Sequence, residues 1–472
     1  MRTRALLFLP LAAYLAFPTR NFYWDGVSFA IEIEKNYPPS GLLHPNHLIY
    51  ELWGAWLYDF FEWAGLPIRS LYLMQIANCV FAGLAVLLLY RCLRIQGYSS
   101  EHGVMAALTF GFSATWWKFA TDADAYIPAV FLLLCAYLLL VLENRRTIWL
   151  AGLAHAVAML FHELAIFFLP VALLLLWKRR TMIVAYCAAA LAPVAIAYVW
   201  AYQAAKPAEG FLRWLTSHSP DSGFSLNPLR DFAYTLRGTA RLLFGGRLPD
   251  VVRNSVSAAA CVLLACAVVA FLLYAWRARP FLWSPPPSVL LLWVSVYAAF
   301  LFFWMPQNTF YRLFYLAPLV LILAMALDDA PQVHRAGFLF AAVLLLWNFL
   351  FLAYPESRAE FNVPLRFALA QHDAWPSGSA IVFHRFHPDL WTISYFNPQA
   401  AWMGLERADL SDMERDLAYA RSQNKPLWVE QTAYEFVAGT AEGRKWLMEH
   451  ERVDELLRFK DEKHEFVFHS IR

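Results

Sequence analysis

Residues 130–142, VFLLLCAYLLLVL, carry no charged side chain, and residues 341–354, AAVLLLWNFLFLAY, repeat this composition. Across the chain of 472 residues, 60% are hydrophobic and only 16% are charged. A soluble globular protein has about a quarter of its residues charged. Long apolar runs that recur through such a chain predict a polytopic α-helical membrane protein.

The rest of the composition narrows the class of protein. A net charge of +2 and the lack of a polybasic tail give no sign of a nucleic-acid partner. The six cysteines fall in or beside apolar runs, which argues against a disulfide framework or a zinc set. No glycosylation sequon is present, as is typical of a bacterial inner-membrane protein. The N-terminus resembles a signal peptide but has no small-residue cleavage site, so we interpret it as a retained first span.

Apolar runs predict eleven transmembrane helices, at 4–19, 70–90, 103–117, 125–142, 148–161, 164–177, 182–202, 254–275, 288–304, 310–327 and 336–354. Arginine and lysine cluster in alternate short loops, and the positive-inside rule then places the N-terminus in the cytoplasm. The odd number of spans places the C-terminus outside. The same parity puts outside the loops 20–69, 118–124, 162–163, 203–253 and 305–309.

Two segments outside the spans have their own patterns. Residues 46–65 in the first extracytoplasmic loop have apolar residues at helical spacing and several tryptophans, which predict an interfacial helix. From residue 355 onward, strand-like runs alternate with helical runs. The strand-like runs lie at 379–384, 400–405, 426–431 and 464–471, and the helical runs at 410–423 and 433–450. We therefore expect a transmembrane domain at 1–354 and a small extracytoplasmic α/β domain at 355–472.

Polar residues predicted at the outer face are the candidates for catalysis and substrate binding. Ionisable groups at a membrane are costly unless water solvates them, an opposite charge pairs with them, or they have a function. Asp25 precedes an apolar stretch and is either a helix cap or a working carboxylate. His44 and His47 are too close in sequence to indicate a metal site by themselves. They are either interfacial histidines or substrate-binding residues.

Two predicted outer turns carry further polar residues. Asp122 and Asp124 lie in TDADAY, residues 121–126, next to Lys118, and can cap a helix, bind a cation or position a sugar hydroxyl. His162 and Glu163 form the other turn, for which a hydrated turn and a functional site are equally compatible with the sequence.

Basic residues at the outer face indicate a place for phosphate. Arg312 begins a span, where an arginine either extends to the interface or clamps a phosphate with its planar set of donors. In a helical conformation, Arg230, Tyr234, Arg237 and Arg241 share one face. A basic stripe outside the cell runs against the usual charge bias and predicts an anionic lipid headgroup as partner. Binding to a lipid surface without catalysis would give the same stripe.

The order of these motifs resembles the GT-C superfamily of membrane glycosyltransferases, in particular its branch similar to protein O-mannosyltransferases. Members of that branch read approximately fWDsGE, then HPPgyPLY, aEVYaL, and a histidine before LLP. The matching text here is YWDGVSF, HPNHLIY, ADAYIPAVF and FHELAIFFLP. The resemblance covers about residues 1–180 in detail. This chain departs from the pattern at Ser28, at Asn46-His47 and at Asp124.

The resemblance implies transfer of a sugar from a polyprenyl phosphate to an acceptor at the extracytoplasmic face. It implies that Asp25 is the essential acidic residue of the first outer loop. Asp124 and Tyr126 match the second acidic position and its tyrosine, and His44 matches the His-Pro motif. His162 and Arg312 match the family's later histidine and the arginine that meets the donor phosphate.

The expected reaction is a single displacement with inversion, in which Asp25 is the general base. Asp124 is predicted as the second catalytic residue, which orients acceptor or donor hydroxyls. Arg312, together with Lys118, His162, Arg237 and Arg241, is expected to neutralise the donor phosphate. His44, His47, Tyr126, Asp122 and Glu163 are expected to contact substrate. The acceptor is left open as a protein, a lipid or a glycan.

No cofactor is predicted, although Asp122, Asp124 and Glu163 leave a divalent cation possible. Two alternatives remain at this stage. One is a transporter or flippase of a lipid-linked substrate, although most charges here lie at the ends of spans rather than at the membrane midplane. The other is a non-catalytic GT-C-like scaffold.

Overall fold

A computed structural model describes residues 2–142, 144–208, 210–216, 227–246, 287–384, 388–405, 410–461 and 464–472, with some residues between 258 and 273. The chain divides into two compact units. The first contains residues 1–19 and 32–355, and the second contains residues 20–31 and 356–472. Residues 20–31 of the first predicted loop therefore group with the C-terminal part of the chain.

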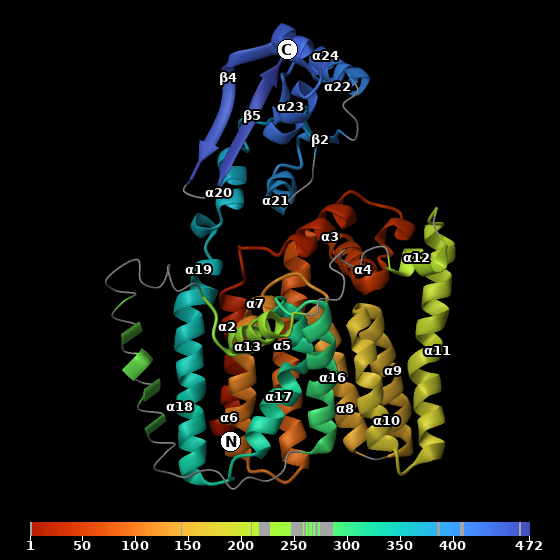
Figure 1. Cartoon of the computed structure of the whole chain (residues 1–472), viewed down its shortest axis with the longest axis vertical. Coiled ribbons are helices and arrows are strands. Elements are labelled where there is room, and N and C mark those ends of the chain that lie inside the picture. The colour runs from red at the N-terminus through yellow and green to blue at the C-terminus, as the bar shows by residue number, and fades with distance from the viewer. Residues whose placement is uncertain are drawn as a thin grey trace. The chain divides into compact units, whose positions relative to one another are not determined.

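The first unit is a bundle of helices (Figure 1). Its first half contains α1 (Arg2–Ala5), η1 (Leu6–Phe8), α2 (Leu9–Ala16), η2 (Pro39–Leu42), η3 (Pro45–His47), α4 (Tyr50–Trp63), α5 (Ser70–Ile95), α6 (Ser100–Gly111), α7 (Ala114–Ala120), α8 (Tyr126–Val141), α9 (Arg145–Phe161), η4 (Glu163–Phe168) and α10 (Leu169–Leu176). Its second half contains α11 (Arg180–Ala205), α12 (Phe211–Thr216), α13 (Pro228–Leu243), α16 (Ser288–Trp304), η5 (Phe310–Arg312), α17 (Leu313–Met325), α18 (Pro331–Asn348) and the π-helical turn η6 (Phe349–Ala353). Helix α3 (Trp24–Glu34) belongs to both units by residue number.

Three described helices are long and apolar enough to cross a membrane: Ser70–Ile95, Arg180–Ala205 and Pro331–Glu356, each of 26 residues. At 1.5 Å per residue such a helix is about 39 Å long, which exceeds the roughly 30 Å of a hydrocarbon core. Shorter apolar helices lie at most of the other predicted spans. The predicted span at 254–275 lies mostly outside the described residues.

Polar caps and prolines set where several helices begin. The Ser99 side chain accepts the backbone N–H of His102 at the start of α6. Asn227 accepts that of Arg230 at the start of α13, and Pro228 follows it at the first helical position. Both are favoured arrangements at helix N-termini, because the first backbone N–H groups have no partner inside the helix.

The interfacial helix expected within residues 46–65 is α4. Its exposed residues include Trp56, Phe60 and Trp63, with exposed fractions of 70%, 56% and 83%. They lie at i, i+4 and i+7 on one face, while Leu52 and Gly54 of the same helix are buried. Such an aromatic face fits the headgroup region of a bilayer.

The second unit contains a five-stranded sheet in the order β2-β1-β3-β5-β4. The strands are β1 (Ala380–Phe383), β2 (Ala401–Gly404), β3 (Leu427–Glu430), β4 (Glu451–Lys460) and β5 (Glu465–Ile471). Its helices are α19 (Tyr354–Glu356, at the boundary), η7 (Ala359–Phe361), α20 (Val363–Ala370), α21 (Pro388–Phe396), α22 (Leu410–Ser422), α23 (Gln431–Ala438) and α24 (Ala441–His450). Strand β1 pairs in parallel with β2 and β3, and β5 pairs antiparallel with β3 and β4.

Helices cover both faces of this sheet. Because side chains alternate along a strand, Ala380 and Val382 pack in one hydrophobic cluster and Ile381 packs in another. The first cluster contains residues of α22, α23 and α24, and the second contains residues of α20 and α21. The second unit is therefore a three-layer α/β arrangement with two cores.

Asn348 connects three segments of the first unit. Its Nδ2 donates to the carbonyl oxygens of Phe112 and Leu243, both at 2.7 Å. Its Oδ1 accepts the N–H of Gly245 at 2.9 Å, and the side chain is fully buried. The end of α13 is thereby fixed against α18 and against the turn that joins α6 to α7.

Replacing Asn348 by leucine is expected to lower the free energy of unfolding by at least ~2 kcal/mol, because it leaves buried backbone groups without partners. The melting temperature in detergent measures this effect. Gln332→Leu, on the exposed start of the same helix, is the control and should change stability little. Equal melting temperatures for the two variants would contradict the role given to Asn348.

Candidate functional site

Asp25 lies in the second unit, in the first turn of α3. The helix begins at Trp24, so Asp25 is inside the first turn rather than at the cap position expected from the sequence. Within this unit the Trp24 ring stacks on Trp391, with centroids 5.1 Å apart. Nearby, Asn362 donates to the carbonyl oxygen of Arg20 at 2.6 Å. A carboxylate in a first turn is stabilised by the helix dipole.

The predicted acidic turn in the first unit is buried. Asp122 and Asp124 are 0% and 2% exposed. The Asp122 carboxylate lies 3.4 Å from Lys118 Nζ, so the two side chains form an ion pair within the turn. The Asn78 side chain of α5 donates to the carbonyl oxygens of both aspartates at 2.8 Å. An amide on a long apolar helix therefore holds the backbone of this turn.

Tyr126 begins α8 directly after this turn and lies among aromatic rings. Its ring centroid is 4.9 Å from His162 and 5.2 Å from Phe310 of η5. His162 is buried, and its Nδ1 accepts the N–H of Leu164 at 3.2 Å, which caps η4. Glu163 is the first residue of η4. A role for His162 at the donor phosphate stays a prediction.

The rings of His44 and His47 stack on each other, with centroids 4.4 Å apart. His47 Nδ1 lies 3.9 Å from the buried carboxylate of Glu51. Tyr198 of α11 donates to the carbonyl oxygen of Pro45 at 2.6 Å, which holds the His-Pro turn in place. The two histidines thus form one polar group in the first unit, and their contact with substrate stays a prediction.

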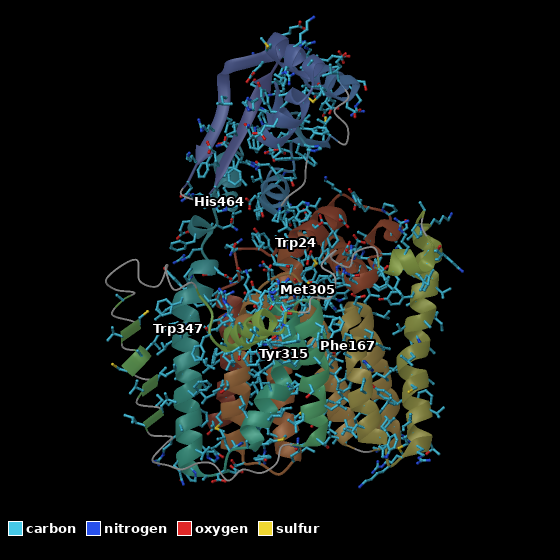
Figure 2. The ribbon with its side chains drawn as sticks, viewed as in Figure 1. Trp24, Phe167, Met305, Tyr315, Trp347 and His464 are labelled. Carbon is cyan, nitrogen blue, oxygen red and sulfur yellow. The ribbon has the colours of Figure 1, made fainter. Side chains whose placement is uncertain are left out.

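Arg312 is fully buried at the end of η5. Its Nη1 donates to the hydroxyl of Tyr315 at 2.8 Å, and its Nη2 donates to the carbonyl oxygen of Pro306 at 2.7 Å. Its Nε has no hydrogen-bond partner among the residues that the structure describes. Figure 2 labels Tyr315, at the start of α17 in the bundle. Within the part of the chain that the structure describes, no carboxylate forms a salt bridge with Arg312.

Helix α13 packs directly over this arginine. A Cβ atom added at Gly238 would lie 2.3 Å from Arg312 Nε, so only glycine allows this approach. The Thr239 hydroxyl lies 3.3 Å from the Tyr315 hydroxyl and continues the hydrogen-bond network onto α13. Figure 1 shows α13 crossing the helices of the bundle rather than running along them.

A cavity of ≈ 170 Å³ lies along α13. Its lining comes from one face of α13 and from the loop before η5: Tyr234, Arg237, Gly238, Arg241, Gln307 and Thr309. The volume is enough for several water molecules, each of which takes about 30 Å³, or for one tetrahedral anion. The cavity is basic, and Gly238 separates it from the buried charge of Arg312.

The structure brings Arg237, Arg241 and Arg312 together around α13 and η5. It places Lys118, Asp122, Asp124, Tyr126 and His162 around the start of α8, in ring contact with η5 through Phe310. Sequence reasoning did not identify Gly238, Gln307 or Thr309. A glycine inside a helix costs about 1 kcal/mol relative to alanine, so the glycine of RGTAR, residues 237–241, was the available signal for a close contact.

Asp122, Asp124 and Glu163 were considered as ligands of a divalent cation. Among the described residues, they are not a group of three ligand atoms close enough to hold one ion.

Comparisons with known proteins show the fold. No family model and no curated protein matches the sequence. A crystal structure of ArnT from Cupriavidus metallidurans bound to undecaprenyl phosphate matches 99% of this chain and 96% of its own, with 10% identity and a TM-score of 0.57. The archaeal oligosaccharyltransferase AglB from Archaeoglobus fulgidus matches 99% and 74%, with 14% identity and a TM-score of 0.46.

The S. cerevisiae protein O-mannosyltransferase Pmt1-Pmt2 complex matches 48% of this chain and 36% of its own, with 16% identity and a TM-score of 0.35. The chain therefore shares the fold of ArnT, and the predicted GT-C resemblance is confirmed at the level of the fold alone.

Replacing Gly238 by alanine is expected to lower the melting temperature. Overpacking against Arg312 costs ~1–3 kcal/mol, which exceeds the ~1 kcal/mol that alanine gains over glycine in a helix. Gly210→Ala is the control, because an added Cβ there meets nothing within 4 Å. A melting temperature for Gly238→Ala that is equal to or above that of the unchanged chain would mean that Arg312 does not lie against α13.

Proposed function

We propose that the chain is a membrane glycosyltransferase that takes a sugar from a polyprenyl-phosphate donor and transfers it to an acceptor hydroxyl. The observation that carries this proposal is the buried guanidinium of Arg312, beneath a cavity lined by Arg237 and Arg241. Burying a charge is costly unless it is paired. An anionic group in the cavity would supply the missing negative charge.

The chemistry of α13 supports a phosphate that is attached to a lipid. Leu229, Phe232 and Leu236 of this helix are 86%, 63% and 64% exposed, and they lie beside the basic stripe. A helix with one basic and one apolar face suits a ligand with an anionic head and an apolar chain. The likeness in fold to ArnT, which was crystallised with undecaprenyl phosphate, supports the same ligand class.

In the proposed reaction, the acceptor oxygen attacks the anomeric carbon of the sugar. The bond between this carbon and the phosphate oxygen breaks, and its electron pair leaves with the polyprenyl phosphate. Arg237 and Arg241, with Arg312 behind them, stabilise the charge on the departing phosphate. We assign Asp25 as the base that takes the acceptor's proton, on the basis of its match to the GT-C motif. A single displacement of this kind inverts the anomeric carbon.

The remaining predicted residues keep their proposed roles in this scheme. Asp124, Asp122 and Tyr126 orient substrate hydroxyls, with Lys118 and His162 on the phosphate side, while His44, His47 and Glu163 contact the substrate. We place the site at the extracytoplasmic face of a bacterial inner membrane, with residues 355–472 on the same side. The acceptor is a protein, a lipid or a glycan.

Binding of undecaprenyl phosphate to the detergent-purified chain tests whether this cavity is the phosphate site. The double variant Arg237→Ala with Arg241→Ala should bind ~10–100-fold more weakly, since hydrogen bonds to a charged group contribute ~1.5–3 kcal/mol. Arg335→Ala, an exposed arginine on α18, is the matched control and should bind as the unchanged chain does. Equal affinity for the double variant would exclude this cavity as the phosphate site.

The catalytic assignment is tested separately. Asp25→Asn should abolish sugar transfer from a panel of undecaprenyl-phosphate hexoses and leave undecaprenyl phosphate binding and the melting temperature unchanged. Asp59→Asn, at an exposed position of α4, should retain activity. Transfer by the Asp25→Asn variant would remove Asp25 as the base. Donor binding without transfer by the unchanged chain, across the whole panel, would favour a non-catalytic scaffold.

A further inference from the structure

A second group of polar side chains lies at the other end of α17 from Arg312. His102 of α6, Asp329 of the connection between α17 and α18, and His334 of α18 each offer a ligand atom, and these atoms lie within 4.8 Å of one another. Helix α17 has 13 residues, so about 20 Å of helix separates this group from Arg312. The group contains none of the residues assigned to glycosyl transfer.

The orientation of His102 is fixed by its other ring nitrogen. Its Nε2 lies 2.8 Å from the carbonyl oxygen of Ala324, a contact in which only the nitrogen can donate. In the neutral ring, the proton is then on Nε2 and the lone pair is on Nδ1. His102 is fully buried, and within the described part of the chain its Nδ1 has no hydrogen-bond partner. This atom lies 3.8 Å from the Asp329 carboxylate. A histidine held by a backbone carbonyl through one nitrogen and free to ligate through the other is the arrangement found in metal sites.

The other two ligands lie together at the surface side of this histidine. His334 Nε2 is 2.7 Å from Asp329 Oδ1. The Ser99 N–H donates to the second carboxylate oxygen at 2.6 Å and orients it. Hydrogen bonds from two sides thus fix the orientation of the Asp329 carboxylate.

We propose that His102 Nδ1, His334 Nε2 and the Asp329 carboxylate bind one Zn²⁺ ion, with a water molecule or the Ser99 hydroxyl as fourth ligand. Two imidazoles and one carboxylate are a preferred zinc set, with bonds of about 2.0–2.2 Å. Ligand atoms of a tetrahedral site with such bonds lie about 3.3–3.6 Å apart. The separations here reach that range with small side-chain movements, in which zinc replaces the proton shared by His334 and Asp329.

The ion would have a structural role. It would join the start of α6, the end of α17 and the start of α18. Asp329 is at the surface, with 31% of its side chain exposed, so the ion has a path to the buried nitrogen of His102. This proposal does not depend on the proposed function.

The test is metal binding by the purified full chain after chelator treatment and dialysis. Zinc analysis should give one equivalent per chain, and Co²⁺ in place of zinc should give the visible absorption of a tetrahedral site. Asp329→Asn, His334→Gln and His102→Gln should each weaken binding by at least about tenfold. Asp328→Asn, the neighbouring carboxylate outside the group, is the matched control and should bind normally.

Size-exclusion profiles and melting temperatures establish that each variant is folded, and the surface variant Asp329→Asn is decisive if His102→Gln does not fold. Substoichiometric zinc in the unchanged chain would overturn the proposal. Full binding by Asp329→Asn and His334→Gln would overturn it as well. Binding that survives these changes but is lost in Asp124→Asn would place the ion at the acidic turn instead.

Discussion

The contact between Gly238 and Arg312 is the constraint on which the candidate site depends. The backbone of α13 approaches a buried guanidinium so closely that a Cβ atom would meet Nε at 2.3 Å. This approach puts Arg312 against the same stretch of α13 that carries Arg237 and Arg241. The cost of leaving a buried charge without a counter-ion is large, so the same contact that builds the cavity also makes it attractive to an anion.

Further hydrogen bonds hold α13 and Arg312 in position. Asn348 holds the C-terminal end of α13, and Thr239 connects its middle to Tyr315. Tyr315 in turn accepts a hydrogen bond from Arg312. A site that stabilises developing charge works best when its donors are fixed before the reaction begins. The hydrogen bonds of α13 would therefore hold the donors of the proposed phosphate site in place, besides stabilising the bundle.

Much of the fold follows from local sequence, because apolar runs of helical length have few other stable forms in a membrane. Strands β1, β2, β3 and β5 lie where short apolar runs predicted them, whereas β4 was missed because ERVDELLRFK is rich in charges that strands disfavour. The segment 433–450 reads as one helix but forms α23 and α24, since Thr440 caps a new start by accepting the Gly443 N–H.

Part of the candidate site could also be predicted from local sequence. The stripe of Tyr234, Arg237 and Arg241 follows from helical periodicity alone, and these residues line the cavity. Gly238 and Gln307 were not predictable, because their roles come from packing between segments distant in sequence. The grouping of residues 20–31 with the C-terminal unit could not be predicted from the sequence either. It depends on tertiary contacts such as that of Trp24 with Trp391.

Helix α17 connects Arg312 with the group formed by His102, Asp329 and His334. It starts directly after Arg312, and near its other end the carbonyl oxygen of Ala324 contacts His102 of α6. Contacts along its length with α16 and α6, together with those at its two ends, set its position along its axis. A shift of α17 would have to break either the buried histidine contact or the hydrogen bonds of Arg312. Anchoring at the His102 end therefore helps to keep the guanidinium fixed beneath α13, about 20 Å away.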